Sequence, residues 1–186
     1  ALRLFGGNSL LANIAIAAKD PCSISLAGLG ARGMGSSCRD RLNGATKAPV
    51  MVVIPGKGSI NAFALGKYEV SVDEMNEFCQ QSGKCKIDNH LEAATPITNI
   101  SMANASAYLE WLSNKSGRNY RLPTLAEWQY AAKSTNALPD PNRNCKLNSR
   151  GIKKGSTLNK TSLGQQNPWG VVNHLGNAQE WVLQPG

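Results

Sequence analysis

Charged side chains are scarce in this sequence. Asp, Glu, Lys and Arg make up 17% of the 186 residues, whereas about 25% is usual in soluble domains. The hydrophobic fraction of 41% is ordinary for a globular protein once the 18 glycines are added. We therefore exclude a disordered chain and a coiled coil. The length predicts one domain, with or without a short additional segment.

Long apolar runs and metal-binding cysteine motifs are also missing. The longest nearly apolar stretch, residues 10–18, is far shorter than the ~20 residues that span a bilayer. It does not have the pattern of a secretory signal. The chain has 2 histidines and no C-x-x-C pair, so the sequence predicts neither a membrane span nor a zinc–thiolate site.

The five cysteines form two close pairs and a remainder. We predict disulfides between Cys22 and Cys38 and between Cys79 and Cys85, each stabilising the fold by about 2–3 kcal/mol. Cys145 is left over. Disulfides imply an oxidising compartment, so we expect a periplasmic or secreted protein. Buried free thiols in a cytosolic protein are the alternative.

Positive charge is concentrated in the last quarter of the chain. The net charge is +8, and every charged residue between Asp140 and Glu180 is basic. Such a stretch either contacts an acidic partner or forms a solvated loop. No aromatic residue lies between Tyr130 and Trp169, so we predict no nucleic-acid binding. The candidate partner-binding basic patch consists of Arg143, Lys146, Arg150, Lys153 and Lys154.

The first 47 residues differ in composition from the rest. Gly, Ala, Ser and Leu dominate them, and four apolar residues fit one helical face: Leu10, Leu11, Ile14 and Ala17. A G-x-G-x-x-G string starts at Gly28, but no strand precedes it, so we do not interpret it as a dinucleotide site. We expect residues 1–47 to be an N-terminal extension or the tail of an upstream domain. Residues 48–186 are expected to form the main domain, truncated at its C-terminal end.

From residue 49 onward the pattern predicts two strands and three helices. The strands are residues 50–54 and 63–70, which are rich in β-branched and aromatic residues. Ser71 and Glu74 form a capping box at the start of the first helix. The second helix has apolar residues at helical spacing and ends at a glycine. A capping box at Thr124 and Glu127 starts a short third helix, after which regular patterning fades.

Six short motifs follow one another between residues 51 and 181. They are M-V-V-I-P-G at 51–56, Y-E-V-S at 68–71, P-I-T-N-I-S at 96–101, R-L-P-T-L-A-E-W at 121–128, N-P-W-G at 167–170 and G-N-A-Q-E-W at 176–181. This series resembles the formylglycine-generating enzyme family, also called the sulfatase-modifying-factor family. The resemblance implies an α+β fold: a compact C-type-lectin-like domain with a twisted antiparallel sheet, two main helices and a large fraction of irregular loop.

We expect structural roles for five residues in these motifs. Thr124 and Glu127 satisfy free N–H groups at a helix start, and a fork of N–H donors such as that of Arg121 suits a structural strut. The set comprises Arg121, Thr124, Glu127, Trp128 and Trp181.

The last motif also suggests a calcium site. The resemblance implies side-chain oxygens from Asn173 and Glu180 and main-chain carbonyl oxygens from Gly176 and Ala178. Calcium takes six to eight hard oxygen ligands of these kinds. Glu180 is a lone acid in a basic stretch. It therefore either helps to bind calcium or takes part in an ion pair or a turn network, and both interpretations stay open.

The resemblance allows two functions. Enzymes of the family are similar to one another in a copper-binding cysteine pair beyond an R-G-G-S-W element that follows the E-W motif, and no cysteine here occupies that position. We interpret the chain as a non-catalytic binding or protein-interaction module that contacts a protein or small ligand through variable loops. The alternative is the scaffold of a copper-dependent formylglycine-generating oxidase that acts on a sulfatase cysteine, with catalytic cysteines beyond Gly186.

Overall fold

The structure is a computed structural model. It describes residues 1–7, 22–28, 37–44, 46–88, 90–132, 145–148, 151–154, 158–164 and 166–184. The helical face predicted at residues 10–17 lies outside these ranges. None of the helices within them combines the length and apolar character that a membrane span requires.

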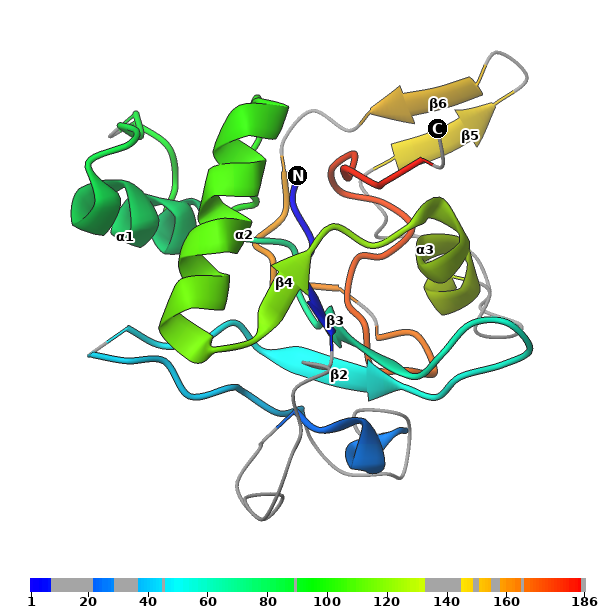
Figure 1. The fold of residues 1–186 in the computed structure, drawn as a ribbon. Coiled ribbons are helices and arrows are strands. Elements are labelled where there is room, and N and C mark those ends of the chain that lie inside the picture. Colours follow the sequence, from blue (N-terminus) through cyan, green and yellow to red (C-terminus); the bar gives the residue numbers. More distant parts are fainter. Residues whose placement is uncertain are drawn as a thin grey trace.

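A four-stranded antiparallel sheet lies at the centre of the molecule (Figure 1). Its strand order is β2-β3-β1-β4. In the register, Val53 lies opposite Ala64, and Phe5 lies between Leu65 and Arg121. The strands are β1 (Phe5–Gly7), β2 (Met51–Ile54), β3 (Phe63–Gly66) and β4 (Asn119–Arg121). Both strands predicted from the sequence are present, although β3 ends four residues before the predicted end at Val70.

Three α-helices in the described ranges accompany the sheet, and the predicted capping boxes and helix end are present. α1 (Val72–Ser82) begins with the capping box of Ser71 and Glu74, and α2 (Met102–Ser116) ends at Gly117 in the left-handed conformation. α3 (Leu125–Ala132) follows Thr124, whose hydroxyl oxygen accepts from the Glu127 N–H at 3.2 Å. A 3-10 turn, η2 (Ile24–Leu26), precedes the sheet strands β2 and β3. Helices, an antiparallel sheet and long irregular segments confirm the α+β class. The lectin-like fold stays a prediction.

The two faces of the sheet bury different residues because side chains alternate along each strand. Met51 and Val53 of β2 pack in a core with Phe78 of α1 and Tyr108 of α2. Val52 and Ile54 of β2 pack on the opposite face in a second core. This core also includes Ala131 of α3 and Val171 of the C-terminal segment. Figure 1 shows α1 and α2 on one side of the sheet and α3 with the C-terminal segment on the other.

Both predicted disulfides are present. Cys22 bonds to Cys38 with a Cα–Cα distance of 5.4 Å, and Cys79 bonds to Cys85 with 4.7 Å. The second bridge ties the C-terminal end of α1 to the following loop. Two disulfides are typical of proteins outside the cytoplasm.

Four of the described strands were not predicted from the sequence: β1, β4 and the two strands of a hairpin. A hairpin of β5 (Cys145–Asn148) and β6 (Gly151–Lys154) lies in the region where regular patterning fades, and it forms a sheet of its own. The strand β1 lies within residues 1–47, yet it pairs with both β3 and β4. A domain boundary at residue 48 stays a prediction, but these first residues contribute to the sheet.

Candidate functional site

The predicted calcium loop, residues 173–180, is a series of tight turns near the end of the chain. Asn173 and Asn177 have φ of 56° and 60°, in the left-handed region that asparagine tolerates better than most residues. The side-chain oxygen of Asn173 lies against the backbone of Gly164, where an added Cβ would be 2.1 Å away from it. The Asn173 amide donates to the Thr161 carbonyl oxygen at 3.4 Å. The local backbone therefore fixes where these side chains lie.

Glu180 is held by two donors. Its carboxylate accepts from Arg3 Nε at 2.9 Å and from Trp128 Nε1 at 2.6 Å. The side chains of Arg3 and Glu180 are 0% and 3% exposed, so this ion pair is buried. Each carboxylate oxygen of Glu180 has one of these partners.

Arg3 is a buried cation surrounded by oxygen atoms. Besides Glu180, its guanidinium donates to the carbonyl oxygens of Gly66 at 2.7 Å, Lys67 at 3.0 Å and Val172 at 2.8 Å. A buried charge is tolerated only when it is paired and its hydrogen bonds are satisfied, and Arg3 meets both conditions. Its partners lie at residues 66–67, 172 and 180, all far from Arg3 in the sequence.

A second buried carboxylate lies beside this pair. Glu69 is 1% exposed and accepts from the Asn177 side-chain amide at 2.8 Å and from the Ala178 N–H at 3.1 Å. Burial raises the pKa of Glu69 to about 7, Arg3 opposes the shift and Glu180 adds to it. The cluster thus combines one guanidinium with two carboxylates. We call Arg3, Glu69, His174, Asn177 and Glu180 the Arg3 cluster.

His174 completes the Arg3 cluster as a neutral group. Its Nε2 lies 2.9 Å from the Trp128 carbonyl oxygen, so Nε2 carries the proton and donates. The centroids of the His174 and Trp128 rings are 4.6 Å apart. Burial lowers the pKa of His174 to about 4. Within the described part of the chain, the buried Nδ1 has no hydrogen-bond partner.

As arranged, these residues do not fit a calcium ion at Glu180. Both of its oxygens already accept hydrogen bonds, one of them from a guanidinium. A metal ion would have to share Glu180 with Arg3 or displace it. The ion-pair interpretation is therefore the one that the contacts support, while calcium binding by Asn173, Gly176, Ala178 and Glu180 stays a prediction.

The residues of the R-L-P-T-x-A-E-W motif make structural contacts. Arg121 and Glu127 form a two-bond ion pair at 2.9 and 2.7 Å. Burial raises the pKa of Glu127, but hydrogen bonds from Arg121 and Thr124 outweigh burial and leave it lowered. The Trp128 ring packs against His174, and its Nε1 donates a hydrogen bond to the Glu180 carboxylate. The half-exposed Trp181 donates from its ring to the Ile100 carbonyl oxygen at 3.2 Å.

Three residues of the predicted basic patch, Lys146, Lys153 and Lys154, lie in the β5–β6 hairpin. The register places Lys146 opposite Lys153 and Cys145 opposite Lys154. Arg143 and Arg150 lie outside the described residues. Lys160, further along the chain, pairs with the exposed Glu92 at 3.1 Å.

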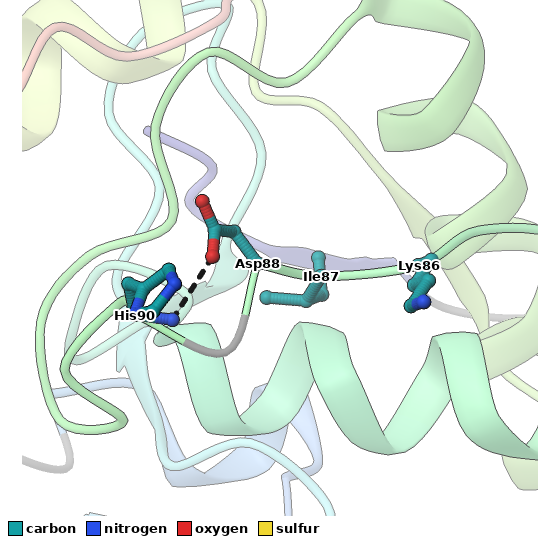
Figure 2. Close-up of a pocket in the computed structure, with 4 residues that line it drawn as sticks. All are labelled: Lys86, Ile87, Asp88 and His90. Carbon is teal, nitrogen blue, oxygen red and sulfur yellow. Dashed lines mark hydrogen bonds between the residues drawn. The ribbon is translucent and has the colours of Figure 1, made fainter.

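A shallow surface hollow of about 400 Å³ lies after the Cys79–Cys85 bridge (Figure 2). Lys86, Ile87, Asp88 and His90 line it, and the His90 N–H donates to Asp88 at 3.0 Å. Two potential metal ligands are too few for a metal centre. Within the described ranges, no three His, Cys, Asp and Glu side chains come together in a way that could hold a metal ion. The hollow therefore adds no chemistry to the candidate site.

Glu180 and Trp128 were singled out from the sequence, but Arg3, Glu69 and His174 were not. Glu69 belongs to the Y-E-V-S motif, where the sequence predicts the end of a strand, and an acidic residue between buried positions is a signal for a buried carboxylate that needs hydrogen-bond donors. Nothing in the local sequence around Arg3 distinguishes it from a surface arginine. His174 stands inside the candidate loop, where its neutral, buried state depends on Trp128.

Comparison with known proteins supports the motif series. The chain matches the family model described as a sulfatase-modifying factor enzyme 1-like domain over residues 28–185. No curated protein and no solved structure gives a significant match. The family match includes all six motifs and extends over most of the chain. The chain therefore belongs to the family of sulfatase-modifying factor enzyme 1-like domains.

Proposed function

We propose that this chain is a non-catalytic binding or protein-interaction module, and that its basic hairpin contacts an acidic partner. The observation that carries the proposal is the register of β5 and β6, which places Lys146 directly opposite Lys153. Like charges at directly opposed positions destabilise a sheet, and an isolated two-stranded hairpin is only marginally stable. A negatively charged partner would remove this repulsion.

The surroundings of the hairpin favour the same conclusion. The hairpin stands apart from the four-stranded sheet (Figure 1). Between Asp140 and Glu180 the sequence has no acidic residue that could neutralise it locally, and Glu180 is itself paired with Arg3. Loops presented by a rigid core are the usual place for recognition.

The disulfides bear on the copper-dependent alternative. Cys22, Cys38, Cys79 and Cys85 are consumed in two bridges, so they cannot supply the thiolate pair that Cu(I) prefers. An oxidase function would require cysteines elsewhere in the protein. The encoded sequence past Gly186 decides this alternative, because paired cysteines after an R-G-G-S-W element would favour the enzyme. The bridges also favour a periplasmic or secreted location.

The binding proposal is tested with a defined polyanion. Fluorescent poly-L-glutamate is titrated at low salt against the wild-type chain and against the Lys153→Glu/Lys154→Glu variant. We expect the variant to bind about tenfold more weakly, since two lost charge contacts amount to about 1–2 kcal/mol.

The matched control is the Lys47→Glu/Lys57→Glu variant. Both residues are exposed in segments away from the hairpin, and the substitution changes the net charge by the same amount. Equal losses in the two variants would show only a general charge effect, and unchanged binding by the hairpin variant would contradict the proposed contact.

A further inference from the structure

The oxygen atoms that surround Arg3 are of the kinds that calcium takes as ligands. The guanidinium contacts one carboxylate oxygen and three main-chain carbonyl oxygens, which belong to Glu180, Gly66, Lys67 and Val172. Calcium binds carboxylate and main-chain carbonyl oxygens in flexible geometry. The four contacts measure between 2.7 and 3.0 Å, as is usual for hydrogen bonds from a guanidinium. Hard oxygen ligands are therefore gathered here around an organic cation.

The main chain on both sides of Arg3 holds this cation in place. The Leu2 carbonyl oxygen accepts from the Val70 N–H at 2.6 Å. The Leu4 carbonyl oxygen accepts from the Gly66 N–H at 2.6 Å as well. The backbone that carries the guanidinium is thus ordered by bonds other than those of the guanidinium itself. Unlike a bound metal ion, whose stabilising effect falls with its free concentration, this cation is a fixed part of the chain.

The two side chains predicted to bind calcium make other contacts. The side-chain oxygen of Asn173 lies against Gly164, where an added Cβ would be 2.1 Å away from it. The amide of the same side chain donates to the Thr161 carbonyl oxygen at 3.4 Å. Glu180 gives one oxygen to the guanidinium and the other to Trp128 Nε1, at 2.6 Å. Both predicted side-chain ligands are therefore used within the protein.

Arg3 and a calcium ion compete for Glu180. Arg3 Nε lies 2.9 Å from Oε1 of Glu180, and calcium binds such oxygens at about 2.3–2.6 Å. An ion on this oxygen would therefore lie no more than about 5.5 Å from Arg3 Nε. The Arg3 and Glu180 side chains are 0% and 3% exposed, so water would screen the repulsion between the two cations poorly. Only one of them can be the partner of Glu180.

We propose that the Arg3 guanidinium takes the place of calcium in this domain, as a cation that the chain itself supplies. The loop 173–180 is then joined to the first strand by Arg3 and Glu180 without a metal ion, contrary to the calcium site predicted from the sequence. The stability of the domain does not depend on calcium. Removal of the guanidinium leaves a buried carboxylate and three carbonyl oxygens without their cation, so calcium binds there only in its absence.

The first measurement compares the full 186-residue chain with its Arg3→Met variant, after EDTA treatment and dialysis. Methionine removes the charge and keeps an unbranched side chain. In differential scanning fluorimetry, calcium should leave the wild-type melting temperature unchanged within about 1 °C and raise that of the variant by at least about 5 °C at saturation. Magnesium, which demands octahedral geometry, should raise it less. A wild type that calcium stabilises, or a variant that it does not stabilise, would overturn the proposal.

The matched control is Arg121→Met. Arg121 also pairs with a carboxylate, that of Glu127, at 2.7 Å, and the substitution changes the net charge by the same amount. This variant should melt at a lower temperature than the wild type, and calcium should not restore the loss. Equal responses of the two variants to calcium would show only a general effect of a carboxylate that has lost its arginine, and would overturn the proposal.

The second measurement needs no variant and remains decisive if Arg3→Met fails to fold without metal ions. Calcium is titrated into the metal-free wild-type chain in a calorimeter. We expect no saturable binding at millimolar calcium, and saturable, stoichiometric binding would overturn the proposal. The unfolded variant is then diluted from urea into buffer with or without calcium. Native near-ultraviolet circular dichroism should return only with calcium, and its failure to return there would also count against the proposal.

Discussion

The two sides of this domain are held together by different means. Beneath α1 and α2 the core is apolar, with Phe78, Tyr108 and Leu112 each no more than 1% exposed. Around the first strand and the loop 173–180, the buried groups also include a guanidinium and two carboxylates. The first region relies on non-directional burial, and the second relies on a small number of hydrogen bonds with fixed geometry.

This difference determines how each region responds to damage. Burial is shared among many contacts, so an apolar core adjusts partly to the loss of one side chain. A buried ion pair is different, because removing one partner leaves the other charged and unsolvated. The Arg3 cluster should therefore be the more fragile of the two regions, even though it contains fewer side chains.

The largest expected effect is that of Arg3→Ala. Glu180 would lose its buried cation, and we expect a loss of about 3–5 kcal/mol in the free energy of unfolding. Leu112→Ala on the apolar side should cost about 2–4 kcal/mol. Urea unfolding of both variants measures the difference. Arg41→Ala, at an exposed position, is the control and should be nearly neutral. An Arg3→Ala loss smaller than that of Leu112→Ala would reverse the comparison.

A smaller effect is expected at a part-buried pair on the apolar side. The Tyr120 hydroxyl donates to Asp40 at 2.6 Å. Burial raises the pKa of Asp40 and the tyrosine hydrogen bond opposes the shift, so the native state holds a proton more strongly than the unfolded chain does. The contribution of Asp40 to stability is therefore present below the ordinary pKa of 3.8 for an aspartate and is lost as pH rises through the native pKa.

The Asp40→Asn variant tests this sign. The free energy of unfolding of the wild type, taken relative to the variant, should fall by up to about 1 kcal/mol as pH rises from about 3 to about 7. Urea titrations across that range provide the measurement. A difference that grows with pH would mean that the ionised carboxylate is the form that the fold stabilises.

The smallest expected effect is that of chelation. Because Arg3 already supplies positive charge to Glu180, EDTA should leave the melting temperature unchanged within about 1 °C. If EDTA lowers the melting temperature and added calcium restores it, the loop binds the metal ion. The two regions would then differ also in their dependence on calcium. Differential scanning fluorimetry with and without calcium suffices.

The local elements of the fold were predictable because their signals are short in range. The capping boxes of Ser71 with Glu74 and of Thr124 with Glu127 each require residues only three positions apart, and the structure confirms both. The cysteine pairs were predictable for a similar reason, since each pair is close in sequence. The six motifs were sufficient for the family, and the family match confirms it.

The hairpin and the first strand were not predictable in the same way. β5 and β6 have few β-branched residues, and lysines occupy opposed positions, so their sequence does not have the alternation of a typical strand. β1 is only three residues long, and its place in the sheet depends on pairing with β3 and β4. Neither neighbour is close to it in sequence.

The sequence by itself determined the family, the helices with their caps, the cysteine pairs and the accumulation of positive charge before Glu180. The tertiary structure alone decided what balances that acid. Arg3 and Glu180 are 177 positions apart, and no local pattern indicates that they meet. Burial then makes the pairing necessary, because a carboxylate removed from water is stable only beside a cation with matching hydrogen bonds.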